Sequence, residues 1–222
     1  MNRITQIFVG QLQPLPPEGQ RTGMFKAPVT GAVALGPEGL AGDQVADRRV
    51  HGGPDQAVHH YPAEHYATLA ARFPAAAGCL APGCLGENLS GLGWTETNVC
   101  LGDVFGLGPA RLQVSRPRNP CWKINHRLGE KQASRFIAEA GITGWYYRVL
   151  AGGTVAPGDT FELLERVAAP IALADAWRIQ EAHRPPRAAL AALVATPGLA
   201  AGWRQRLAER LAWLDRNPEL PL

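Results

Sequence analysis

The sequence contains little that would direct the chain out of a cell or into a membrane. No uninterrupted apolar stretch reaches about 18 residues, the length that a membrane span needs. The short apolar stretch at residues 7–9 is soon followed by Gln11, Gln13 and Pro14, from which no signal peptide can be built. The cysteines, at 79, 84, 100 and 121, form no CxxC pair of the kind found in zinc ribbons and thioredoxin sites. We therefore expect reduced thiols in a cytoplasmic protein without a membrane span.

The chain also lacks the common motifs for phosphate binding, dinucleotide binding, serine hydrolysis and zinc proteolysis, namely GxxxxGK[ST], GxGxxG, GxSxG and HExxH. Its net charge is only +3 and its arginines form no basic run, so we expect no nucleic-acid partner. Apolar residues make up 46% of the 222 residues and charged residues 18%, which is enough apolar material for a folded core. This length allows one domain of ordinary size and a small second one.

Glycine and alanine divide the chain into two regions. Of the 25 glycines, 23 lie before residue 168, whereas 15 of the last 55 residues are alanine. We therefore predict short strands with tight turns in residues 1–167 and a helical domain in residues 168–222. The expected strands cover residues 4–12, 25–29, 103–107, 111–115, 145–150 and 160–164. The expected helices cover residues 63–72, 130–140, 173–183, 186–195 and 201–216. Many short strands with few helices predict a mainly β, mixed α/β fold: a closed or nearly closed β-barrel with helical insertions, plus a small C-terminal bundle.

The segment 50–58 is the first candidate for chemistry. Two glycines and a proline describe a loop whose backbone can approach another group closely, with His51 and Asp55 on either side. Taken alone, the segment is explained slightly better by a structural turn with a surface histidine. His59, His60 and His65 fit no standard zinc spacing. In an alternating strand His59 and His60 face opposite sides, so one of them is expected only to pack.

A second candidate is the single cysteine of the segment 115–125. Arg116, Arg118 and Lys123 surround Cys121 with positive charge, and two prolines constrain the path of the loop. Cations favour the thiolate, which is the form that attacks carbon or binds metal, and the same cations suit a phosphate. We therefore interpret Cys121 as functional, and the other three cysteines as packing residues.

The segment 86–89 is weaker evidence taken alone. Glu87 and Asn88 lie in an apolar, strand-like stretch, so their side chains must either face water or find buried partners. A turn that precedes a strand would explain them as well.

Together these segments resemble the MOSC-domain proteins, and specifically the YiiM-like group with a three-helix C-terminal extension. The matching pieces, in chain order, are Gly39-Leu40-Ala41-Gly42-Asp43, His51-Gly52-Gly53-Pro54-Asp55, Gly86-Glu87-Asn88-Leu89, Asn98 with Gly102-Asp103, the PRNPCWK segment from Pro117, and Gly144-Trp145-Tyr146-Tyr147-Arg148-Val149. They span roughly residues 1–165, and the helical tail completes the match. Arg116 departs from the group, in which an uncharged or acidic residue is expected at this position.

The resemblance implies a MOSC-type β-barrel that binds the molybdenum cofactor, with Cys121 as the thiolate ligand of molybdenum. Arg118, Lys123 and Lys26 would hold the pyranopterin and its phosphate, and His51 and Asn88 would line the metal pocket. Gly52, Gly53 and Pro120 complete the expected cofactor-binding set. His51 is the expected proton donor, because histidine can give up a proton near neutral pH.

The resemblance also implies an activity. YiiM-like proteins reduce N-hydroxylated purines and related base analogues, including 6-hydroxylaminopurine, to the amine, and so detoxify them. A separate flavoprotein reductase supplies their electrons. The C-terminal helices would provide a docking surface for that reductase or for a second subunit of a homodimer, or would simply cover the barrel.

Two other functions remain open at this point. In one, the protein is a carrier in which Cys121 holds a persulfide or a molybdenum cofactor in transit, without turnover. In the other, it is a metal-free transferase that uses Cys121 with His51 or His126.

Overall fold

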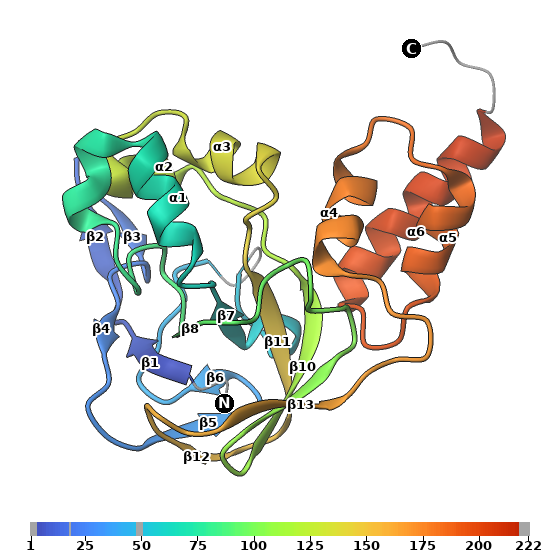
Figure 1. The fold of residues 1–222 in the computed structure, drawn as a ribbon. Helices are drawn as coiled ribbons and strands as arrows, with labels where there is room; N and C mark the ends of the chain where they lie inside the picture. The colour runs from blue at the N-terminus through green and yellow to red at the C-terminus, as the bar shows by residue number, and fades with distance from the viewer. Residues whose placement is uncertain (1–3, 18, 48–50, 218–222) are drawn as a thin grey trace.

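The computed structural model describes residues 4–17, 19–47 and 51–217. Over these residues, the largest sheet contains eight strands in the order β13-β9-β10-β11-β7-β8-β1-β4, and it curls into a half-barrel (Figure 1). Neighbouring strands run antiparallel, apart from the parallel pair β7 and β8. The strands are β1 (Ile4–Val9), β4 (Ala27–Pro28), β7 (Val58–His60), β8 (Leu89–Gly91), β9 (Val104–Leu107), β10 (Ala110–Pro117), β11 (Trp145–Ala151) and β13 (Phe161–Glu165). The mainly β, mixed α/β fold is therefore confirmed.

Shorter strands, which the sequence analysis did not predict, complete the β-structure. They are β2 (Gln13–Leu15), β3 (Gln20–Thr22), β5 (Val33–Gly36), β6 (Gly39–Leu40) and β12 (Gly153–Val155). β2 pairs with β3, and β12, β5 and β6 form a small sheet of their own. Two to four residues are too few to show the alternation by which a strand is recognised in sequence.

Three short helices cover one end of the sheet (Figure 1). α1 (His65–Arg72) and α3 (Ala133–Glu139) lie inside the predicted ranges 63–72 and 130–140. α2 (Lys123–Leu128) was not predicted, because six residues give little helical periodicity. It ends at Gly129, whose φ of 67° is the left-handed conformation favoured at helix C-termini. The short 3₁₀ helices η1 (Pro54–Gln56) and η2 (Pro74–Cys79) lie in loops.

The C-terminal helices pack beside β10 (Figure 1). α4 (Leu173–Glu181), α5 (Arg187–Ala195) and α6 (Ala201–Arg216) match the three predicted helices closely. Trp203, Leu207 and Leu214 form the buried stripe of α6. Trp213 lies to one side of this stripe and is 44% exposed, and the guanidinium of Arg184 lies over its ring.

One continuous apolar core joins the half-barrel to the C-terminal helices. Leu101, Leu112 and Val114 belong to the same buried cluster as Leu173 and Trp203. A second cluster, around Leu69, Ile124 and Ile137, lies under α1, α2 and α3. The domain boundary between residues 167 and 168 stays a prediction. No helix among the described residues has the length and apolar character of a membrane span.

The cysteines correct one expectation. All four are free, and Cys84 and Cys100 are buried as predicted for packing residues. Cys79 is instead exposed at the end of η2, where its thiol donates a hydrogen bond to the carbonyl of Ala76. The short helix places this side chain at the surface, so Cys79 is not a packing residue.

Candidate functional site

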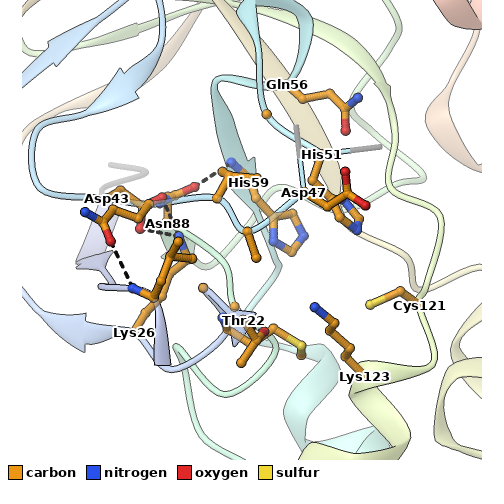
Figure 2. Close-up of a pocket in the computed structure, with 18 of the residues that line it drawn as sticks. Thr22, Lys26, Asp43, Asp47, His51, Gln56, His59, Asn88, Cys121 and Lys123 are labelled. Carbon is orange, nitrogen blue, oxygen red and sulfur yellow. Dashed lines mark hydrogen bonds and ion pairs between the residues drawn. The ribbon is translucent and has the colours of Figure 1, made fainter. Parts of the chain in front are cut away.

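A cavity of about 490 Å³ collects the predicted site residues from separate parts of the chain (Figure 2). All of them except Pro120 line it: Lys26, His51, Gly52, Gly53, Asn88, Arg118, Cys121 and Lys123. In Figure 2, Cys121 and Lys123 lie on one side of the cavity, and Lys26, Asp43 and Asn88 lie on the other. The volume is typical of a site for a small molecule or cofactor.

The surroundings of Cys121 favour ionisation of its thiol. Burial alone would raise its pKa, but a hydrogen bond with His51, the charge of Arg118 and a hydrogen bond from the backbone N–H of Lys123 lower the pKa of Cys121 to about 6. Arg118 places a guanidinium nitrogen 3.9 Å from the sulfur. Cys121 is therefore largely a thiolate at neutral pH, which is the form needed for attack or for metal binding. By contrast, burial raises the pKa of Cys84 to about 12.

Tyr146 connects the groups around this thiol, and the sequence analysis did not single it out as a site residue. Its hydroxyl lies 3.5 Å from Nδ1 of His51, and Arg118 hydrogen-bonds to the same side chain. Burial raises the pKa of Tyr146, and the charge of Arg118 offsets part of that effect. Alternation along β11 could have identified Tyr146, since Trp145 and Tyr147 on either side both belong to the apolar core.

A buried ion pair forms the opposite wall of the cavity. The Lys26 ammonium lies 2.5 Å from the Asp43 carboxylate, and these side chains are only 6% and 10% exposed. Burial lowers the pKa of Lys26, whereas the charge of Asp43 acts in the opposite direction. Asp43 also accepts hydrogen bonds from the N–H of Gly10 and from the amide of Asn88, both 2.8 Å long.

Asn88 holds this wall in place. Its Oδ1 accepts a hydrogen bond from the backbone N–H of His59, and its Nδ2 donates to the carbonyl of Phe8 and to Asp43. Both N–H groups of the amide are therefore engaged within the protein. Asn88 borders the cavity as predicted, and its side chain holds Asp43 toward Lys26.

The side chain of Glu87 forms hydrogen bonds with buried groups of the protein rather than with water. Its Oε1 accepts hydrogen bonds from the hydroxyl of Tyr66 (2.5 Å) and the N–H of Gly83 (2.6 Å), and its Oε2 accepts one from the N–H of Leu85. Burial raises the pKa of Glu87, and these hydrogen bonds oppose the shift. The carboxyl group thus fixes the loop that leads to Gly86 and Asn88 at the cavity wall.

The two adjacent histidines of β7 face opposite sides, as alternation predicts. His60 stacks on Trp145 in the core with a ring distance of 4.5 Å, whereas His59 lines the cavity. Burial and the nearby charge of Arg118 lower the pKa of His59 far enough to keep its ring neutral. Nε2 of His59 is buried and has no hydrogen-bond partner among the described residues.

The basic residues of the 115–125 segment separate into two groups. Arg118 and Lys123 line the cavity, and the Lys123 ammonium donates to the carbonyl of Arg21 at 2.9 Å. Arg116 points away from the cavity and lies over the ring of Trp203 in α6. His126 is exposed and contacts the ring of Trp122, so His51 is the histidine that reaches Cys121.

Glycine residues form part of the remaining cavity wall. Gly53 has a φ of 79°, and a Cβ built on it would meet no atom of the described residues within 4 Å, so its backbone faces open space among them. Such a backbone can approach a bound group closely. Among the described residues, no three His, Cys, Asp or Glu side chains are grouped as metal ligands. A metal held by its own organic ligand and one protein thiolate would not need such a group.

The chain resembles known proteins in sequence and in structure. A model of the MOSC domain matches residues 47–162. Protein YiiM of Escherichia coli (strain K12) is 37% identical over 211 residues, which cover 92% of this chain and 90% of that protein. The crystal structure of YiiM from Escherichia coli superposes with a TM-score of 0.81 at 31% identity, covering 96% of this chain and 94% of the other. A protein of Gibberella moniliformis named "Reductase" is 36% identical over 73% of this chain, which corresponds to 29% of its own length.

Proposed function

The chain belongs to the MOSC-domain family, and from this premise we propose that it is a molybdenum-cofactor-dependent reductase. Its substrates would be N-hydroxylated compounds such as 6-hydroxylaminopurine and related base analogues, which it would convert to the amine. The family supports a function connected with the molybdenum cofactor, and the relative named "Reductase" supports redox chemistry. The choice of N-hydroxylated bases rests on the resemblance to the YiiM-like group.

The observation that carries the proposal is the thiolate of Cys121 inside a cavity of suitable size. A thiolate is a soft ligand of the kind that suits molybdenum, and the pKa of about 6 makes it available at neutral pH. The cavity also offers a glycine backbone at Gly53 and a ring nitrogen of the neutral His59 that has no hydrogen-bond partner within the described part of the chain. The residues present therefore fit a bulky group that combines a metal centre with a polar ring system.

Different side chains of the cavity would hold different parts of that group. Cys121 would bind the metal. Arg118 and Lys123 would face the pterin phosphate, because both line the cavity near the thiol. Lys26 is already paired with Asp43, so its ammonium would act together with that carboxylate on polar ring atoms. When bound, the molybdenum cofactor supplies two-electron removal of an oxygen atom from the substrate.

The reaction consumes two electrons and two protons for each N–OH group and releases an amine and water. His51 would deliver a proton, and its contact with Cys121 and its distance of 3.5 Å from the hydroxyl of Tyr146 support this role. Tyr146 links His51 to Arg118, so the three groups keep a fixed arrangement around the reacting position. We propose a separate flavoprotein reductase as the source of the electrons.

The direct test is an assay of the purified holoprotein with 6-hydroxylaminopurine and a chemical electron donor. We expect stoichiometric conversion to the amine, with many turnovers per molybdenum. Bound cofactor without turnover would instead identify a carrier. Activity in cofactor-free protein that is lost when Cys121 is alkylated would identify a cysteine-dependent transferase.

A further inference from the structure

The loop that carries His51 is tied to the C-terminal helices through Asp55. This residue lies in η1, just beyond the Gly52-Gly53 turn. Its Oδ2 accepts a hydrogen bond of 2.7 Å from the backbone N–H of Ala201, the first residue of α6. That N–H has no acceptor within its own helix, because the first N–H groups of a helix lie before any helical carbonyl. A carboxylate at this position also matches the positive end of the helix dipole.

Arg148 and Ser115 reinforce the same junction. Nε of Arg148 donates to Oδ1 of Asp55 at 2.9 Å, and the Arg148 guanidinium also reaches the carbonyl of Gly198, just before α6. The Ser115 hydroxyl lies 2.6 Å from the carbonyl of Asp55. The carbonyl of Ser115 in turn accepts from the N–H of Ala200 at 2.9 Å. β10, β11, η1 and the start of α6 therefore meet at one hydrogen-bonded point.

α6 also contacts the segment that leads to Cys121. The guanidinium of Arg116 lies over the ring of Trp203, 5.8 Å from its centroid. From there it donates to the carbonyl of Pro117 and to Oδ1 of Asn119. The first turn of α6 thus supports the two loops that bring His51 and Cys121 together.

We propose that Asp55 is a positioning residue that anchors the His51 loop to α6, so that the C-terminal helices set the contact between His51 and Cys121. The two glycines between His51 and Asp55 have φ angles of 74° and 79°. Glycine is the residue type with the greatest backbone freedom. Without an anchor directly after them, His51 would sample many positions relative to the thiol. The proposal deepens the proposed function by assigning the helical tail a role in the reactive site.

Two variants remove this anchor from opposite sides. Asp55→Ala deletes the acceptor. Ala201→Pro removes the N–H that Asp55 accepts and puts the Cδ atom of the proline ring in its place, which pushes the Asp55 carboxylate away from α6. Proline is well tolerated at the first position of a helix, and Ala200 has φ −55° and ψ 130°, which suits a residue before proline. Ala201→Pro therefore keeps the test decisive if Asp55→Ala fails to fold.

The matched control is Asp159→Ala. Asp159 also accepts a backbone hydrogen bond, from the N–H of Ala156 at 2.8 Å, but it does not line the cavity. All variants are made in the full chain with Cys79→Ser, which removes the exposed competing thiol, and are produced in cells that cannot synthesise molybdopterin. The measurement is the rate of Cys121 alkylation by iodoacetamide at pH 7, which needs neither cofactor nor substrate. It can therefore fail or succeed independently of the proposed reductase activity.

We expect Asp55→Ala and Ala201→Pro to change the rate of Cys121 alkylation about threefold or more, because a displaced His51 loop alters how the thiol is covered in the cavity that His51 and Cys121 both line. Asp159→Ala should react at the rate of the unsubstituted background while showing a comparable loss of thermal stability. Folded Ala201→Pro protein that is alkylated at the background rate would overturn the proposal. An equal change in Asp159→Ala would also overturn it, since the effect would then follow stability alone.

Discussion

Two histidines border the cavity, and their surroundings give them different chemistry. His51 contacts the thiol of Cys121 and the hydroxyl of Tyr146. His59 is fully enclosed between the strand and the cavity, and burial lowers its pKa, so it stays neutral. A neutral imidazole can accept a hydrogen bond or pack against a ring, but it gives up no proton at physiological pH. We therefore propose His51, rather than His59, as the proton donor.

The ionisation of Cys121 gives the first prediction. In cofactor-free protein, alkylation of Cys121 should rise with pH to a plateau, with a midpoint near the pKa of about 6. The sign follows from the direction of the shift: a thiol whose pKa is lowered is already ionised at neutral pH, whereas an ordinary thiol reaches its plateau only above about pH 9. Peptide mapping after iodoacetamide treatment separates the sites. Cys84 should remain unmodified throughout, because burial raises its pKa to about 12. A Cys121 midpoint above pH 8 would contradict this electrostatic account.

The proton-donor role gives the second prediction. His51→Gln should slow N–OH reduction about 10²-fold or more, in the range typical of a lost general acid, while molybdenum and pterin remain bound. Glutamine keeps a hydrogen-bonding side chain but cannot deliver a proton. Turnover is measured with a chemical electron donor, alongside the molybdenum content of each preparation. Wild-type turnover in the loaded variant would rule out His51 as the donor.

Without the family resemblance, which supplied Lys26 and Asn88, the candidate site could be predicted from the sequence only where a residue type carries its own chemistry. Cys121, His51 and Arg118 were identified because thiol, imidazole and guanidinium groups in glycine- and proline-rich loops are typical of reactive sites. Tyr146 and Asp43 were not identified as site residues from the sequence, because Tyr146 belongs to an aromatic strand and Asp43 to a turn. Only the fold brings them to the cavity. The spacing in the sequence could not show that Arg116 and Arg118 lie in different surroundings. The register of β10 turns Arg116 toward Trp203, away from the cavity that Arg118 lines.

At the scale of the elements, the start of β11 sets the position of several site residues. Gly144 has a φ of 67°, and its carbonyl accepts the backbone N–H of Arg118 at 3.0 Å. A Cβ at this position would lie 2.5 Å from the carbonyl of His60 and 3.2 Å from Nε2 of His59. Because backbone atoms are close on that side, no side-chain rotation can relieve the clash.

Gly144→Ala should therefore destabilise the protein by about 2 kcal/mol or more, which combines backbone strain with steric overlap. For a chain of this size that corresponds to a fall in Tm of about 4–8 °C. The control is Gly158→Ala, where φ is 91° but a Cβ would meet nothing within 4 Å. Strain alone should cost this control about 1 kcal/mol. Thermal unfolding followed by circular dichroism compares the two. Equal losses in both variants would show that the close approach at Gly144 is unimportant.

The elements themselves were predictable in proportion to their length. The sixteen-residue helix α6 was placed correctly at both ends, because its apolar stripe and the preceding Pro197-Gly198 mark it clearly. Strands of two to four residues, such as β4 and β6, depend on pairing partners that are distant in sequence. α2 is only six residues long, and packing of Ile124 and Leu128 in the second apolar cluster stabilises it more than local preference does.

At the scale of the whole molecule, the barrel and the C-terminal helices should unfold together. They share one apolar cluster, and Asp55 and Arg116 bridge them with polar contacts. We expect a single thermal transition for the full chain, followed equally by circular dichroism and tryptophan fluorescence. A truncated chain that lacks residues 170–222 should lose this transition, because Leu112 and Val114 would lose Leu173 and Trp203 as packing partners. A truncated chain that melts cooperatively at the wild-type temperature would contradict this expectation.

The proposed reaction depends on Cys121 holding a molybdenum cofactor in this cavity. The most direct measurement is the molybdenum and pterin content of the wild type and of Cys121→Ser, each produced in cells that can and cannot synthesise molybdopterin. Serine is nearly isosteric, but its hydroxyl stays protonated near neutral pH and is a poorer ligand than a soft thiolate. We predict molybdenum and pterin in the wild type from competent cells only. Cys121→Ser from the same cells should retain less molybdenum and part of the pterin, because Arg118 and Lys123 are unchanged. Zinc without pterin in every preparation, or full molybdenum in Cys121→Ser, would contradict the account.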